Sequence, residues 1–134
     1  MLRDERQIAL NEAVEASLHA AHVHEHGAAL LDEDMLGLRE FAAQRRRDAD
    51  VLAEHVRQLG DLPMEPDPEY EVATDIVSQI KAALAEDQRR LVIERSNEAE
   101  EALAAALREA LRHDLTPDAH RDLERILTSQ ARLT

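Results

Sequence analysis

GDLPMEPDP, residues 60–68, is the stretch that divides the chain and decides how its helices connect. It holds one of the three glycines and three of the four prolines, so no helix crosses it. The chain of 134 residues is 44% hydrophobic but only 1% aromatic, and Ala and Leu supply most of its apolar side chains. This composition favours helices over an all-β fold. The sequence therefore predicts two helical halves, one on each side of the break.

Two helices are predicted before the break, at about residues 5–31 and 34–59. Apolar side chains recur at helical spacing along the first: Leu10, Val14, Leu18, Ala21 and Ala28. Asp32 and Asp34 offer N-caps for the second helix, and Gly60 ends it. Because the link between them is short, we expect the two helices to be antiparallel neighbours.

Three helical segments are predicted after the break. They are a crossover helix at about residues 69–84, a third bundle helix at about 88–112 and a fourth at about 117–133. Pro68 and Pro117 each stand at the first position of a helix, and the apolar stripe changes phase near Asp87. The linker and crossover helix together can run back along the bundle, which makes the second and third helices parallel. The prediction is a single all-α domain over residues 1–134.

This connectivity, with one long crossover, is that of ferritin-like four-helix bundles. Three stretches also resemble a bacterial ferritin-like family of unknown function, within the rubrerythrin/ferritin superfamily: LNEAVEASL (10–18), LAEHVRQLGDLP (52–63) and NEAEEALAAALREALRHDLTPDAHRDLERIL (97–127). The resemblance implies the fold and an association with stress rather than a defined activity. Two features depart from the family. Leu107 stands where the family often has Tyr, and the fourth helix ends before the late His of its relatives.

A di-iron centre in such a bundle needs one Glu from each of two helices and a Glu-x-x-His pair from each of the others. The register places Leu18, Arg45 with Asp48, Glu100 and Gln130 at these positions, and the sequence contains no Glu-x-x-His pair. An arginine there would repel metal cations. We therefore predict no cofactor, and instead a buried ion network of Glu100, Arg45 and Asp48 with Gln130 nearby.

The histidine-rich stretch AHVHEHG, residues 21–27, suggests an alternative metal site. Four side chains share one flank of the predicted first helix: Glu15, His19, His22 and His26. His22 and His26, at i and i+4, could chelate zinc, nickel or copper, with Glu15 or His19 as a third donor. The plainer interpretation is a polar flank at an edge of the bundle or at a subunit interface. His24 is expected to point away from this stripe.

Several classes of function are disfavoured by composition. The absence of cysteine excludes disulfides, thiolate metal sites and cysteine nucleophiles. A formal charge of −13 disfavours nucleic-acid binding, because no basic face could displace counterions from phosphates. No apolar stretch approaches the roughly 20 residues that span a bilayer. The opening MLRDERQIAL lacks a signal-peptide core, so a cytoplasmic location is expected.

Self-association is expected because the fourth helix is the shortest and would leave part of the bundle groove uncovered. Apolar residues outside the main stripes add to this surface: Leu2, Ile8, Val23, Leu30 and Leu31. The predicted function is that of a non-catalytic ferritin-like bundle, a structural or stress-associated interaction protein that has lost its di-iron centre. It would form a homodimer or higher oligomer, with another protein as a candidate partner. The alternative is a metal-binding or ferroxidase-type bundle that holds iron or another divalent metal on the histidine stripe or at a non-standard core site.

Overall fold

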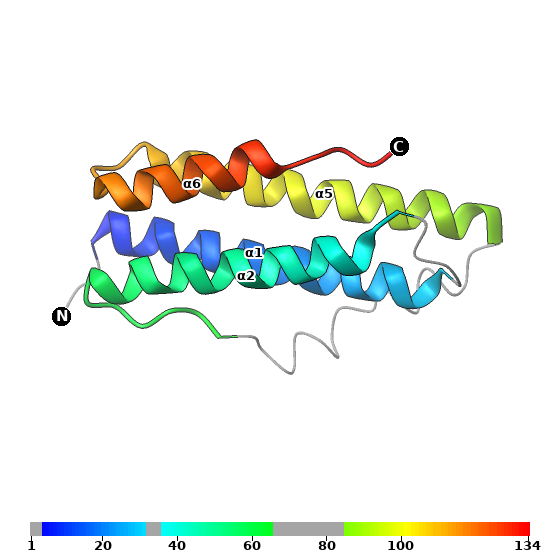
Figure 1. Cartoon of the computed structure of the whole chain (residues 1–134), viewed down its shortest axis with the longest axis horizontal. Helices are drawn as coiled ribbons and strands as arrows, with labels where there is room; N and C mark the ends of the chain where they lie inside the picture. Colours follow the sequence, from blue (N-terminus) through cyan, green and yellow to red (C-terminus); the bar gives the residue numbers. More distant parts are fainter. Residues whose placement is uncertain (1–3, 32–35, 66–84) are drawn as a thin grey trace.

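The computed structural model describes residues 4–31, 36–65 and 85–134, and these form a bundle of four helices without strands (Figure 1). The helices are α1 (Glu5–Leu30), α2 (Leu38–Gln58), α5 (Ala85–Leu111) and α6 (Pro117–Ser129). The all-α prediction is confirmed for this part of the chain. None of these helices is long and apolar enough to cross a membrane. The predicted crossover helix at 69–84, and its junction with the third helix, lie outside the described residues.

The four helices form two antiparallel hairpins, α1 with α2 and α5 with α6 (Figure 1). Helices α2 and α5 run in the same direction, as predicted for the second and third bundle helices. Helix α1 packs extensively against both α2 and α5, whereas α6 makes lighter contacts with α2 and α5. Helix α1 is therefore the element that joins the two hairpins.

The helix boundaries follow local capping chemistry at two of the predicted starts. Asp4 and Gln7 form a reciprocal capping box at the start of α1, because each side chain accepts a hydrogen bond from the other residue's backbone N–H. At the start of α6, the hydroxyl of Thr116 accepts a hydrogen bond from the backbone N–H of Ala119. The predicted start of the second helix, near residue 34, is wrong. Gly37 precedes α2 with a left-handed backbone (φ 67°), so the helix begins at Leu38.

The predicted end of the fourth helix, at residue 133, is also wrong. Helix α6 ends at Ser129, and residues 130–134 leave the helical path. Tertiary hydrogen bonds account for the difference. The side chain of Gln130 bonds to the backbone of Glu100, and the backbone of Leu133 bonds to Asn97. These contacts hold the segment against α5 in a non-helical conformation.

The main core lies at the end of the bundle where α6 covers the other helices. Its large buried side chains are Leu10, Val14, Leu52, Val56, Leu103, Leu107, Leu123 and Ile126. On α1, buried positions alternate at intervals of four and three residues: Leu10, Val14, Ser17, Ala21, His24 and Ala28. This stripe passes through Ser17 and leaves Leu18 only partly buried. The expectation that Leu18 is the inward position at mid-helix was therefore wrong by one residue.

The apolar residues predicted to lie outside the core behave differently from one another. Val23 is buried with Ala20 and Ala99, whereas Leu30 and Leu31 pack against a second small cluster within the chain. Only Ile8 is exposed, with 46% of its surface accessible, and Leu2 lies outside the described residues. Most of the surface argument for self-association is therefore wrong for the described residues, because α1 is covered on two sides rather than one.

Candidate functional site

Arg45 is the centre of a buried ionic network between α2 and α5. Only 1% of its surface is exposed. Its Nη2 donates to Glu100 Oε1 at 2.6 Å, and its Nε lies 3.1 and 2.9 Å from the two oxygens of the same carboxylate. Its Nη1 donates to Asp48 Oδ2 at 2.7 Å. The structure thus brings together the three charged side chains that the sequence predicted as a network.

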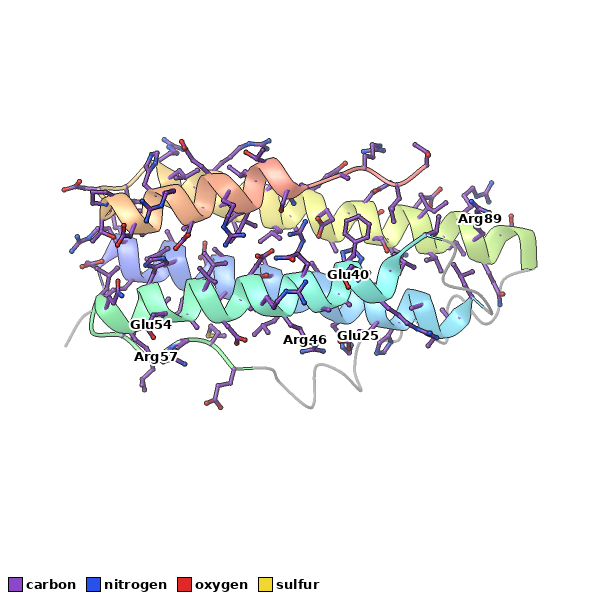
Figure 2. The ribbon with its side chains drawn as sticks, in the orientation of Figure 1. Glu25, Glu40, Arg46, Glu54, Arg57 and Arg89 are labelled. Carbon is purple, nitrogen blue, oxygen red and sulfur yellow. The ribbon has the colours of Figure 1, made fainter. Side chains whose placement is uncertain are left out.

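The next residue along α2, Arg46, shows the contrasting surface arrangement. Its Nε and Nη2 donate to the two carboxylate oxygens of Glu25 on α1, at 2.6 and 2.7 Å. This pair lies on the outside of the α1–α2 hairpin (Figure 2), and both side chains are about 40% exposed. Two consecutive arginines therefore make similar bidentate contacts, one in the core and one at the partly exposed surface. They form a natural matched pair for experiments.

His24 is a member of the network that the sequence analysis missed. It is buried on α1, and its Nε2 lies 3.1 Å from Glu100 Oε2. We assign a proton to Nε2, because an ionised carboxylate can only accept a hydrogen bond. The Nδ1 atom is buried with no hydrogen-bond partner among the described residues, and the ring lies 5.7 Å from that of Phe41. The prediction that His24 points away from the stripe holds, but it points into the core.

The end of α6 closes the network from the other side. Gln130 Nε2 donates to the backbone oxygen of Glu100 at 2.7 Å and lies 3.5 Å from its Oε1. The hydroxyl of Ser129 accepts a hydrogen bond from Arg45 Nη1 at 3.2 Å. Gln130 thus lies beside the network as predicted, whereas Ser129 was not predicted as a direct partner of Arg45.

Two further polar contacts join α6 to α2. His55 Nε2 lies 2.7 Å from Asp122 Oδ2, and Arg125 Nη1 lies 3.6 Å from Asp48 Oδ1. His55 is buried, and its Nδ1 has no hydrogen-bond partner among the described residues. A polar ladder therefore runs along the contact between α2 and α6, while the buried apolar residues of α6 face the main core.

The charges of the network hold one another in their ionised forms. Burial alone raises the pKa of Glu100, but hydrogen bonds from His24 and Arg45 and the positive charge of Arg45 outweigh it and lower this pKa to about 2. Burial likewise lowers the pKa of Arg45, but its bonds to Glu100 and Asp48 raise it above the ordinary value. Arg125, half-exposed, supplies a second positive charge beside Asp48.

The histidine stripe is spread along one side of α1. The rings of His22 and His26 pack together, with centroids 4.1 Å apart. Glu15 is exposed, and burial lowers the pKa of His19 while the charge of Glu15 opposes this shift. Glu15 and His26 are separated by about 16 Å along the helix axis, so the four side chains cannot converge on one ion. Among the residues that the structure describes, no group of three or more His, Asp or Glu side chains could hold a metal ion.

The mid-bundle residues also do not fit a di-iron centre. Both carboxylate oxygens of Glu100 already accept hydrogen bonds from Arg45, and a permanent cation occupies the space between Glu100 and Asp48. On α1, the hydroxyl of Ser17 donates to the backbone oxygen of Arg45 at 2.6 Å and offers no carboxylate. The donor set lacks the paired glutamates that would bridge two metal ions.

Comparisons with known proteins do not identify the chain. No protein-family model, no curated protein and no solved structure matches it. The ferritin-like resemblance therefore stays a prediction from the sequence. The function must be argued from the buried network and from the surfaces around it.

Proposed function

We propose that this chain is a non-catalytic ferritin-like bundle, a structural or stress-associated interaction protein in which an ion network takes the place of a di-iron centre. One observation carries the proposal. The guanidinium of Arg45 is buried near the middle of α2, with Glu100 and Asp48 bound to it at 2.6 and 2.7 Å. It is a fixed cation at the depth where such a bundle would hold its metals.

Electrostatic repulsion supports this proposal. A divalent ion placed 4 Å from the guanidinium of Arg45 would be repelled by about 8 kcal/mol at an effective dielectric constant of about 20. Its best carboxylate ligand, Glu100, would also have to give up its hydrogen bonds to Arg45 and His24. A metal would therefore have to displace Arg45 rather than join it.

The arrangement of the network also argues against catalysis. Among the residues that the structure describes, His24 is the buried acid–base group that contacts Glu100, and only 1% of its surface is exposed. Each charged side chain of the network is bonded to another side chain of the same chain. A catalytic group must reach its substrate, and these groups instead satisfy one another.

Self-association belongs to the same proposal, on a different surface from the one first predicted. Ile8, Leu62 and Met64 are large apolar residues with 46%, 78% and 42% of their surface exposed. Asn11 holds the segment around Leu62 and Met64 against α1, through hydrogen bonds of 2.9 and 2.8 Å to their backbones. Large apolar residues exposed on a protein surface favour an interface. Light scattering at micromolar concentration should give at least a dimeric mass, and a monomeric mass would contradict this part of the proposal.

Metal analysis tests the central claim. Untagged protein from iron-supplemented culture would be examined by elemental analysis and for oxygen consumption with ferrous iron. We expect iron far below stoichiometry and no oxidation above buffer. About two iron ions per chain would overturn the proposal. About one zinc, nickel or copper ion per chain, lost when His22 and His26 are both replaced by alanine, would favour the histidine-stripe alternative.

A further inference from the structure

Residues 130–134, here called the C-terminal strap, lie along α5 and are held there by side chains of that helix. The amide of Asn97 brackets the backbone of Leu133: its Oδ1 accepts from the Leu133 N–H at 2.9 Å, and its Nδ2 donates to the Leu133 carbonyl at 3.0 Å. Asn97 is itself buried. A side-chain amide that pairs with both backbone groups of one residue recognises extended chain regardless of that residue's identity.

Side chains on the strap add selectivity to this backbone contact. Arg132 Nη1 lies 2.9 Å from Glu101 Oε1, one residue before the bracketed position. Leu133 packs against the apolar cluster of Ala28, Leu38 and Val92. Helix α5 and its neighbours therefore favour an aliphatic residue at the bracketed position. The preference for Arg before it is weaker, because the side chains of Arg132 and Glu101 are 72% and 68% exposed.

The strap does not fill the space available to it. A hollow of about 210 Å³ lies beside it, and Ala131, Ala104 and Arg108 are among the residues that line it. Arg108 is exposed and makes no ion pair among the described residues. A side chain larger than that of Ala131 would occupy the hollow. The acidic residues that line it, Glu100 and Glu101, are already paired with arginines, so an acidic side chain there would meet the charge of Arg108.

We propose that this face of α5 is a docking groove for an extended segment of a partner protein with an acidic–Arg–aliphatic sequence, and that the strap is its intramolecular occupant. The inference rests on the proposed function as an interaction protein and names the chemistry of the partner. When an extended segment docks in this way, hydrogen bonds to its backbone supply affinity for any sequence, and pockets for its side chains supply the specificity. The partner segment outcompetes the strap through the extra contacts in the hollow.

The competition predicts how affinity depends on the strap. A ligand can bind the groove only in molecules whose strap is released. When a larger fraction of molecules has a released strap, the apparent dissociation constant of the ligand is therefore lower. Leu133→Asp removes the apolar anchor of the strap and should free the groove. Asn97→Ala removes the bracket that any occupant needs. Glu109→Ala changes an exposed residue of α5 that does not line the hollow, and serves as the control.

The test uses the full chain and two acetylated, fluorescent peptides, one with the sequence of residues 130–134 and one with the same sequence carrying Ala131→Glu. We expect the Ala131→Glu peptide to bind at least tenfold more tightly, and Leu133→Asp in the chain to strengthen its binding about tenfold further. In the Leu133→Asp chain, whose strap is already released, adding Asn97→Ala should weaken binding at least tenfold; Glu109→Ala should leave binding unchanged. Melting curves followed by circular dichroism would show that each variant is folded.

Three results would overturn the inference: no saturable binding of either peptide, equal binding by the folded Leu133→Asp chain with and without Asn97→Ala, or no gain from Leu133→Asp. Metal content measured on the same samples distinguishes a failure of the proposed function from a failure of the docking groove. Stoichiometric iron would overturn the proposed function whatever the peptides do. Metal-free protein that binds neither peptide would overturn the docking groove alone.

Discussion

Replacing Arg45 with alanine is expected to destabilise the fold by about 3–5 kcal/mol, because it leaves two buried carboxylates without their shared counter-charge. The contacts that remain in the structure favour a loss of stability near the lower end of this range. The carboxylate of Glu100 would keep its 3.1 Å contact with His24, and Asp48 would keep a 2.9 Å hydrogen bond from Gln44 and the charge of Arg125 at 3.6 Å. We therefore expect about 3 kcal/mol, which corresponds to a fall of roughly 10 °C in Tm for a chain of this size.

Arg46→Ala is the matched control, because it deletes the same side chain one residue away. Its partner Glu25 and Arg46 itself are each about 40% exposed, and exposed pairs contribute about 0–1 kcal/mol. Urea unfolding of both variants at pH 7, followed by circular dichroism, measures the difference in the free energy of unfolding. Equal losses for the two variants, or a loss below about 1 kcal/mol for Arg45→Ala, would refute the claim that the network is buried and mutually dependent.

The remaining predictions concern pH, helix contact and the attachment of α6. The pKa of Glu100 is lowered from 4.5 to about 2, so its stabilising contribution is complete above pH 4.5 and is lost as the pH falls towards 2. Urea unfolding across this range should show a smaller loss for Glu100→Gln than for the native chain; equal losses would contradict the assignment. Gly27→Ala should destabilise by about 1 kcal/mol despite a better helix former, because the new Cβ would lie 2.8 Å from Val92 Cγ1; a raised Tm would show that Val92 can move. Asp122→Ala should cost about 1–3 kcal/mol, since buried His55 loses its hydrogen-bond partner; an unchanged urea midpoint would mean that the pair is not formed in solution.

The ionic network could be predicted because α2 and α5 are buried mainly on one face. On α2 the buried residues Ala42, Arg45, Ala49, Leu52 and Val56 follow one stripe, so the phase of the stripe places Arg45 inside. Glu100 shares a face of α5 with Leu103 and Leu107, which are buried in the main core. A charged residue in such a stripe requires an opposite charge nearby. Periodicity and charge together therefore identified the contact between Arg45 and Glu100.

Helix α1 was harder to predict, because it packs against two helices instead of one. Its apolar side chains are spread around the helix, and the buried stripe includes Ser17 and His24 beside alanines. The signal for His24 was present in its spacing from Ala21 and Ala28, at intervals of three and four residues. The prediction missed it because it treated the neighbouring histidines as a separate polar stripe. The end of α6 was missed for another reason, since the tertiary contacts of Asn97 and Gln130 override helical periodicity.

The network also bears on how the two hairpins find their alignment. The core between them is built mostly from Ala, Val and Leu, whose apolar contacts are not directional. A slide of about 5.4 Å would separate Glu100 from both Arg45 and His24, and would leave Arg45 with Asp48 as its remaining partner in the network. The apolar residues thus supply the attraction between the hairpins, while a single glutamate fixes the longitudinal register. Arg45 has Asp48 beside it on α2, whereas the cation that pairs with Glu100 comes from the other hairpin. Burial of Glu100 therefore depends on the first hairpin, and we expect the two hairpins to fold as one cooperative unit.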